Sequence, residues 1–283
     1  LVIPDAHAEG GEALWVFGTV DPPLGGGPHG RTQIFAWASH DSELRHWNRT
    51  LALQLPPGYS AWNTDVAPAG GNGSYVMAIE LQAPSSVVGV PFSTAFAVCD
   101  GCGSDLSGGW RLLDAGTHLF TKARYNACPT IRFVPTDGYY YLLTLFDSVP
   151  PGNTFDTVVV RSKDLSSGSW SPKPSSPRIV LAPDNQPGSI EHRPMPGSTL
   201  DLCGKECQRW NGSIVPPQHV SGTAFRLNAK NYTDIDASDI DFVQLPNGST
   251  YVVYCTGNQQ YGYAYNAAAM VDASVDVWLQ SYF

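Results

Sequence analysis

Apolar and polar positions alternate along this chain in strand-like segments that recur at a long interval. One recurring segment is an apolar strand followed by a polar turn that ends in tryptophan. Its copies are Phe35–Trp47, Phe96–Trp110 and Val158–Trp170. The three tryptophans are 63 and 60 residues apart. An interval of this length is typical of a repeated supersecondary unit.

A second recurring segment is an aromatic strand that follows a glycine-containing turn. Its copies are Gly10–Thr19, Gly71–Ile79, Asp137–Leu143 and Asn247–Tyr254. The first three copies again step by about 60 residues, and the last lies close to two further steps. The missing copy would fall in residues 171–235, which are rich in Pro, Gly and Cys. We therefore expect a degenerate unit with a loop insertion there.

The two patterns predict an all-β chain of about five units. Four-stranded antiparallel blades around a central pocket satisfy this period, because radial closure shelters the edges of the sheets. We therefore predict one five-bladed β-propeller domain over residues 1–283. A β-sandwich is the alternative, but it does not explain so long a period.

Composition agrees with this architecture and excludes several classes of function. Of 283 residues, 42% are hydrophobic and 14% charged, with 28 Gly and 23 Pro. This content favours strands joined by many turns. The net charge of −9 argues against a nucleic-acid partner, since an acidic chain repels phosphates. No apolar run approaches the roughly 20 residues that span a bilayer, so we expect no membrane span. Self-assembly is possible, and the sequence does not decide it.

The cysteines bear on the cellular compartment. Cys99 and Cys102 form one closely spaced pair, Cys203 and Cys207 another, and Cys128 and Cys255 stand apart. A four-thiolate zinc site is disfavoured because about 100 residues separate the two pairs, so we expect no metal centre from cysteine. The alternative is two small disulfide loops, with the remaining cysteines either bonded to each other or buried as thiols.

Glycosylation sequons favour a secreted, extracellular glycoprotein. Five fit the pattern Asn-x-Ser/Thr without proline, at Asn48, Asn72, Asn211, Asn231 and Asn247. Most lie in turn-like polar stretches, where the surface can carry a glycan. The chain begins at Leu1 rather than Met, as expected after removal of a signal peptide or in a truncated chain.

Candidate chemistry lies in the segments just before the glycine-turn strands. In a propeller these segments form the innermost strands, whose ends face the central pocket. They are Pro4–His7, Trp62–Val66, Tyr125–Pro129 and Ser238–Phe242. Three of the four carry acidic residues, and carboxylates are rarely buried unless paired or functional. The plainer explanation for any single Asp is that it starts a strand by bonding its own backbone.

These segments resemble glycoside hydrolase family 43 and the related propellers of families 32 and 117. Pro4-Asp5-Ala6-His7 followed by Trp15–Asp21 resembles the family's opening, and Ala61–Val66 resembles its second-blade segment. The resemblance implies that Asp5 is the catalytic base and that Asp65 orients the site and modulates the pKa of the acid.

The chain departs from the family where the general acid belongs. The third-blade Glu is replaced by Ala127, with Asn126 beside it, and neither donates a proton usefully. Glu191 and Asp239 are the candidate substitutes, with Asp241 also near. Glu80 ranks lower because it lies at the far end of its strand.

Further residues are candidates for binding substrate. Aromatic rings pack on the C–H faces of sugars, and amide groups bond hydroxyls, although core packing is the commoner fate of aromatics. The candidates are His7, Trp62, Asn63, Tyr125, Asn126, Asp241, Asn258 and Gln259. Ca²⁺ held by Asp239 and Asp241 in the central channel is the one candidate cofactor, because hard oxygen ligands suit it.

Two functions follow from these residues. The first is a secreted glycoside hydrolase that cleaves an oligo- or polysaccharide by carboxylate acid/base catalysis. The second is a catalytically inactive propeller that binds glycan or serves as a structural extracellular module. Asp5 and Asp65 together favour the hydrolase, whereas the missing acid favours the binding module.

Overall fold

The computed structural model describes residues 1–4, 6–20, 31–71, 73–87, 90–113, 126–147, 155–166, 169–172, 178–181, 198–199, 208–210, 213–215, 236–258 and 263–283. Within these ranges the elements are β-strands, apart from the short helix α2(Val275–Gln280). The all-β prediction is therefore confirmed. No helix in the described ranges is long and apolar enough to cross a membrane.

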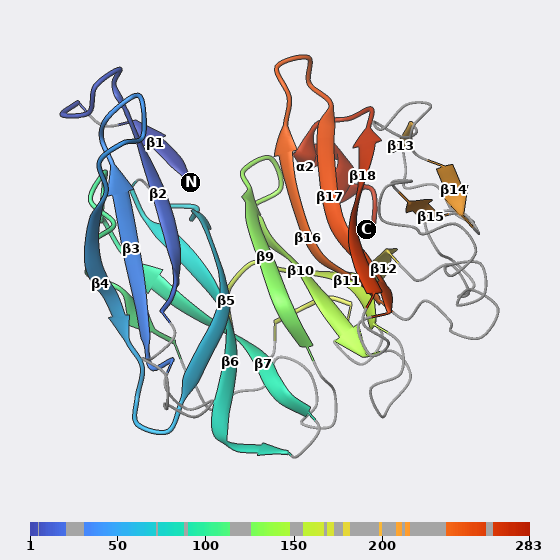
Figure 1. The fold of residues 1–283 in the computed structure, drawn as a ribbon, viewed down its shortest axis with the longest axis horizontal. Helices are drawn as coiled ribbons and strands as arrows, with labels where there is room; N and C mark the ends of the chain where they lie inside the picture. Colours follow the sequence, from blue (N-terminus) through green and yellow to red (C-terminus); the bar gives the residue numbers. More distant parts are fainter. Residues whose placement is uncertain are drawn as a thin grey trace. The chain divides into compact units, whose positions relative to one another are not determined.

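Two complete four-stranded antiparallel sheets form the first part of the chain (Figure 1). The first sheet runs in the order β1(Val2–Pro4), β2(Glu12–Thr19), β3(Gln33–Ser39) and β4(Asn48–Gln54). The second runs in the order β5(Ser60–Pro68), β6(Tyr75–Val87), β7(Val90–Cys99) and β8(Arg111–Leu112). Strands pair with their sequence neighbours, as predicted for propeller blades.

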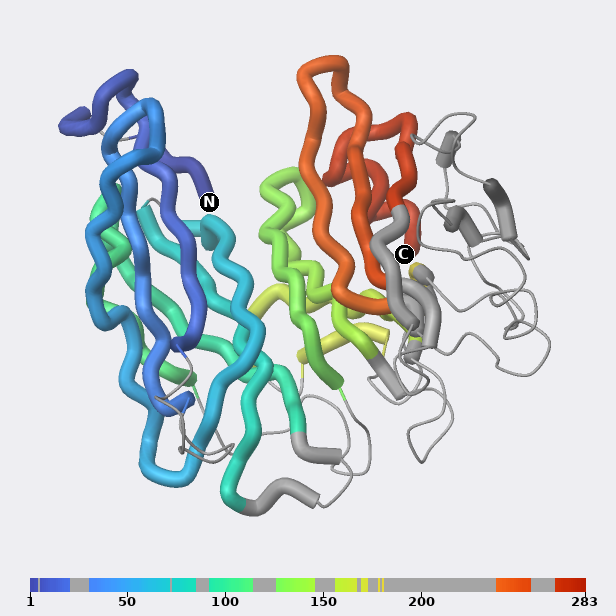
Figure 2. Tube along the Cα trace, in the orientation of Figure 1, coloured from blue at the N-terminus to red at the C-terminus, as the bar shows by residue number. Residues whose placement is uncertain are grey.

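Most later strands also pair with a sequence neighbour, and a parallel pair between Phe155 and Asp236 joins two strands that are not neighbours in the chain. Strand β9(Asn126–Val134) is followed in its sheet by β10(Tyr139–Asp147) and β11(Phe155–Ser162), and β12(Arg178–Leu181) pairs antiparallel with β11. Strands β16(Asp236–Gln244), β17(Thr250–Asn258) and β18(Tyr263–Val271) form an antiparallel meander (Figure 2). The short strands are β13(Ser198–Thr199), which pairs with β18, and the hairpin β14(Gln208–Trp210) and β15(Ser213–Val215).

The chain divides into two compact units. One comprises residues 1–142 and 161–174, and the other residues 143–160 and 175–283. The assignment of residues 1–283 to one domain stays a prediction. Most of the predicted degenerate copy at 171–235 lies outside the described residues.

The hydrophobic alternation on β6 explains how the first unit packs. Tyr75, Met77, Ile79 and Leu81 are all buried and share one face of the strand, since strand side chains alternate between faces. This face joins a single apolar cluster with Trp15 of β2, Ile34 of β3 and Leu53 of β4. The two sheets of the first unit therefore share one core.

A disulfide shapes the loop that follows β7. Cys99 and Cys102 are bonded, with their Cα atoms 5.8 Å apart. The side chains of Leu106 and Trp110 anchor the rest of the loop in the core, and the indole N–H of Trp110 donates to the Leu106 carbonyl at 3.0 Å. Cys203 and Cys207 lie outside the described residues, and Cys128 and Cys255 are half-buried thiols.

The third glycine turn is held by a polar network within the first unit. The Tyr141 hydroxyl donates to Asp137 at 2.5 Å and accepts from Arg161 at 3.1 Å. Burial, followed by the bond to Asp137, raises the pKa of Tyr141 to about 12. The phenol therefore stays protonated at any physiological pH and keeps donating to Asp137.

Two leucines on β4 provide a matched test of this core. Leu53 is 6% exposed and Leu51, two residues earlier, is 44% exposed. We expect Leu53→Ala to lower the free energy of unfolding by about 2–5 kcal/mol, because it removes buried methyl groups and leaves a cavity. Leu51→Ala should cost about half of that or less. Equal losses in denaturant titrations would contradict the packing described.

Candidate functional site

Asp65 lies in the polar face that the second sheet turns toward β9. Its partner on β6 is Ala78, so Asp65 shares that face with Glu80, two residues further along β6. Asp65 Oδ2 accepts from the backbone N–H of Ile131 at 2.7 Å and from the Arg132 guanidinium at 2.8 Å. The carboxylate of Asp65 therefore fastens β5 to β9, and its ion pair with Arg132 is about three-quarters shielded from solvent.

Glu80 is the most deeply buried carboxylate of this face, with 4% of the residue exposed. Its Oε2 accepts from the Asn63 amide at 2.7 Å and from the backbone N–H of Cys128 at 3.0 Å. The Cys128 thiol lies 3.8 Å from the same oxygen. Glu80 thus reaches the segment of β9 that the sequence predicted to be part of the site.

The sequence ranked Glu80 below Glu191 and Asp239 as a candidate acid, and that ranking stays a prediction. The contact of Glu80 with Cys128 is one that sequence reasoning missed. Glu80 and Cys128 are 48 residues apart, and only the packing of β6 on β9 joins them. The one available signal was a Glu inside an otherwise apolar central strand, Tyr75–Leu81.

Asn126 and Trp62 complete this polar face. The buried Asn126 side chain accepts from the backbone N–H of Thr94 at 2.6 Å, so it ties β9 to β7. Trp62 is half-buried, and the Arg31 guanidinium covers its ring at 3.8 Å from the centroid. One face of this predicted sugar platform is therefore already occupied by a cation.

Backbone irregularity recurs in the predicted site segments. The β5–β6 register shifts between Ala61 and Thr64, and the β16–β17 register shifts between Ser238 and Asp241. Cys128 in β9 and Asp239 in β16 have φ values of 50° and 51°, which are sterically disfavoured for residues other than glycine. Such bulges and strained residues occur preferentially beside functional sites.

The second unit holds Asp239 and Asp241 on β16, and both residues are exposed. The Ser238 hydroxyl donates to Asp239 at 2.9 Å, and the backbone N–H of Phe242 donates to Asp241 at 2.7 Å. Within the described ranges no group of three His, Cys, Asp or Glu side chains could hold a metal ion. Calcium at Asp239 and Asp241 stays a prediction.

Several predicted site residues lie outside what the structure describes. They are Asp5, Tyr125, Glu191 and Gln259, together with the side chain of Asn258 and the sequons at Asn72, Asn211 and Asn231. The two sequons within the described ranges, at Asn48 and Asn247, are both exposed, as a glycan requires. The roles predicted for all of these residues stay predictions.

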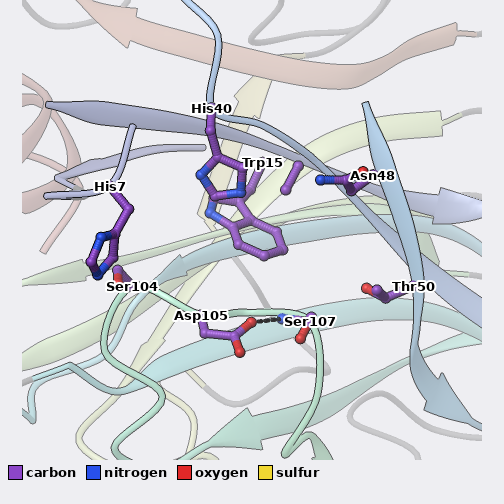
Figure 3. A pocket seen from close by; sticks show the side chains of 9 residues that line it. His7, Trp15, His40, Asn48, Thr50, Ser104, Asp105 and Ser107 are labelled. Atoms are coloured by element: carbon purple, nitrogen blue, oxygen red, sulfur yellow. Dashed lines mark hydrogen bonds between the residues drawn. The ribbon is translucent and has the colours of Figure 1, made fainter. Parts of the chain in front are cut away.

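A cavity of about 330 Å³ in the first unit gathers residues that the sequence did not group (Figure 3). His7, predicted to bind substrate, lines it together with His40 and Asp105. The remaining lining residues are Trp15, Ala38, Asn48, Thr50, Ser104 and Ser107. Strands β2–β4 supply one wall, and the disulfide-bearing loop after β7 supplies the other.

The segments around this cavity are fixed by their own hydrogen bonds. The backbone N–H of Glu9 donates to the His40 carbonyl at 2.8 Å, which joins the segment of His7 to that of His40. Asp105 accepts from the hydroxyl and the backbone N–H of Ser107, and these bonds, with a further contribution from His40, lower its pKa. Asp105 is therefore anionic at neutral pH.

Comparison with known proteins establishes the fold. The sequence matches no family model and no curated protein. The structure is similar to a fructofuranosidase from Schwanniomyces occidentalis complexed with fructose, with a TM-score of 0.52 and 9% identity over 94% of this chain and 42% of that chain. It is similar to a thermostable family-43 glycoside hydrolase, with a TM-score of 0.52 and 12% identity over 95% of this chain and 66% of that chain.

A third similar structure is a Cellvibrio cellulosa α-L-arabinanase complexed with arabinohexaose, with a TM-score of 0.51 and 10% identity over 100% of this chain and 78% of that chain. These matches confirm the predicted five-bladed propeller fold of the family 43 and 32 glycoside hydrolases. The chain spans less than two thirds of the fructofuranosidase and of the thermostable hydrolase. At such identities the likeness concerns the fold alone.

The Asp65 ion pair provides a test of the β5–β9 junction. We expect Asp65→Asn to lower the free energy of unfolding by about 1.5–3 kcal/mol, because it removes charge-assisted bonds that are largely shielded from water. Asp100→Asn is the matched control, since Asp100 pairs with Arg111 at 3.4 Å and both side chains are mostly exposed. That change should cost below about 0.5 kcal/mol by denaturant titration. Equal effects would contradict a structural role for Asp65.

The lowered pKa of Asp105 predicts a pH-dependent contribution to stability. Since the pKa of the folded state lies below the ordinary value of 3.8, the contribution is present above that pH and is lost as the pH falls through the folded pKa. Asp105→Asn should therefore destabilise the protein at pH 6 and have progressively less effect below pH ~4. An effect on thermal unfolding that grows on acidification would contradict this sign.

Proposed function

We propose that this protein is a secreted glycoside hydrolase that cleaves furanose-containing oligo- or polysaccharides. The observation that carries the proposal is the recurrence of register shifts and positive φ at the three predicted site segments on β5, β9 and β16. Of the three residues other than glycine with positive φ in the described ranges, two lie in those segments. Such strain persists only where the surrounding structure imposes it, and active sites are where it concentrates.

The proposed reaction divides its roles among the carboxylates. Asp5 accepts a proton from water, the water oxygen attacks the anomeric carbon, and the bond from that carbon to the leaving oxygen breaks. A carboxylic acid donates the proton that the leaving oxygen takes up. Glu191 and Asp239 are the proposed donors, because Ala127 stands where the resembled family has its Glu.

Asp65 and Glu80 serve as positioning residues in this proposal. Asp65 is already engaged by Arg132 and Ile131, which suits an orienting carboxylate better than a nucleophile. Glu80 fixes the strained Cys128 backbone and the Asn63 amide through one oxygen. Together they hold the innermost strands β5 and β9 in a defined register, as a preorganised site requires.

The proposed substrate class rests on the similar structures. The similar proteins are complexed with fructose and with arabinohexaose, so arabino-oligosaccharides and fructose-terminated oligosaccharides are the first candidates. The sequons and the Cys99–Cys102 disulfide support an extracellular location, since disulfides persist in oxidising compartments.

Release of reducing sugar from these oligosaccharides tests the proposal. Asp5→Asn should lower kcat/KM by at least about 10³-fold, because Asn cannot accept the proton. Asp272→Asn, which changes an exposed Asp after β18, should leave hydrolysis unchanged. Glu80→Gln should lower kcat and leave KM nearly unchanged if it only positions the site.

The possible outcomes separate the two functions. Binding of the oligosaccharides without release would identify a glycan-binding module and overturn the hydrolase proposal. Release that Asp5→Asn does not diminish would overturn the mechanism. Absence of both binding and release would remove the carbohydrate assignment altogether.

A further inference from the structure

We propose that the cavity between β2–β4 and the loop after β7 is a saccharide site that holds a single sugar ring. It is separate from the polar face of β5, β6 and β9, and it does not depend on hydrolysis. Its volume of about 330 Å³ lies at the lower end of the range for small-molecule sites, roughly 300–1,000 Å³.

Trp15 is a buried aromatic side chain in the wall of the cavity. Trp15 is 4% exposed, and its indole Nε1–H has no acceptor among the described residues. Trp15 lines the cavity, and Figure 3 shows its ring between His40 and the loop that carries Ser104 and Asp105. Nε1 itself is buried, so Trp15 offers its ring as an apolar wall of the cavity, and its indole N–H reports on what binds beside it.

The lining selects an uncharged ligand that is rich in hydroxyl groups. None of the described lining residues is Lys or Arg, so a phosphate or another anion has no cationic partner. His7, His40 and Asp105 do not form a group that could hold a metal ion. The remaining polar groups are two imidazoles, a carboxylate, an amide and hydroxyls, beside the apolar surface of Trp15 and Ala38. A sugar ring, with one apolar face and a rim of hydroxyls, matches this set.

The walls of the cavity are built before any ligand binds. Asp41 accepts from the backbone N–H groups of Glu43, Arg45 and His46 at 2.8–2.9 Å, which fixes the turn after His40. On the opposite wall, the Gly103 N–H donates to the Gly73 carbonyl at 2.9 Å, beside the Cys99–Cys102 disulfide. A preorganised site of this kind loses little entropy on binding.

The sugar ring has two possible sources, and a sequon in the cavity wall provides one of them. Asn48 and Thr50, the first and third residues of one sequon, both line the cavity. The ring is therefore either part of a free saccharide or the first residue of a glycan attached to Asn48. The chemistry that the cavity recognises is the same in both cases.

The indole resonance of Trp15 reports on the cavity directly. In protein made in bacteria, which lacks the glycan, Trp15→Phe assigns this resonance, and the other seven tryptophans report that the chain is folded. Arabinose, fructose and N-acetylglucosamine are then titrated, with an expected Kd on the order of 1 mM for a single ring. We expect the Trp15 Nε1–H resonance to shift with at least one of them.

Two histidines in neighbouring positions supply the matched variants. His40→Gln should weaken binding roughly tenfold, the loss of one good hydrogen bond. His46→Gln should leave it unchanged, because His46 does not line the cavity and the substitution keeps the backbone N–H that donates to Asp41. A shift that His40→Gln leaves unaltered would locate the binding elsewhere and overturn the proposal.

Protein from a secreting eukaryotic host tests the second source. A glycan on Asn48, identified by mass spectrometry, should shift the Trp15 resonance relative to the bacterial protein. This result supports the proposal with the glycan as occupant, whereas a shift with free sugar supports the free saccharide. If neither free sugar nor the Asn48 glycan moves the Trp15 resonance, the proposal is wrong.

Discussion

The double burial of β6 is the constraint on which the first unit depends. Tyr75, Met77, Ile79 and Leu81 leave the strand on one face and enter the core shared with the first sheet. Ala78 and Glu80 leave it on the other face, toward β9. A strand enclosed on both faces cannot send a polar group to solvent, so Glu80 must find donors inside the protein. It finds them on Asn63 and Cys128.

The same requirement explains why the junction with β9 is polar. Strand β9 presents backbone N–H groups toward the second sheet, and a buried N–H needs an acceptor. Glu80 accepts from the backbone N–H of Cys128, and Asp65 accepts from the backbone N–H of Ile131. In the other direction, the Asn126 side chain on β9 accepts from the backbone N–H of Thr94 on β7. The contacts are specific in direction and position, so they set the register of β9, which apolar packing alone leaves free to slide. Register in turn decides where the segment from Asn126 to Cys128 stands.

In a polar junction of this kind, the carboxylates that fix the strand register are also placed where a site could form. The propeller fold, shared with hydrolases that carry fructose and arabinohexaose, does not assign an activity. In this chain Glu80 accepts from the backbone N–H of Cys128, next to Ala127, in one of the segments that the sequence predicted to form the site. The cavity lined by Trp15 is a second place in the first unit where separate segments of the chain meet.

Local patterns in the sequence were sufficient to predict the all-β propeller architecture. The interval of about 60 residues, the strand that precedes each glycine turn and the tryptophan that closes each unit were visible as local patterns, and the strands β2, β6, β10 and β17 lie on the predicted copies. A disulfide loop at Cys99 and Cys102 could be predicted for the same reason, because the partners are only three positions apart. Local alternation and turn chemistry act over a few residues, so they can be read along the chain.

Only the tertiary structure decided which side chains meet. Glu80 with Cys128, Asp65 with Arg132, and Arg31 over Trp62 join residues 48, 67 and 31 positions apart. His7, His40 and Asp105 belong to three separate segments that no sequence interval relates, and they line one cavity. These contacts depend on how strands of different sheets pack together. The residue pattern along a single strand does not indicate which residues of another sheet will contact it.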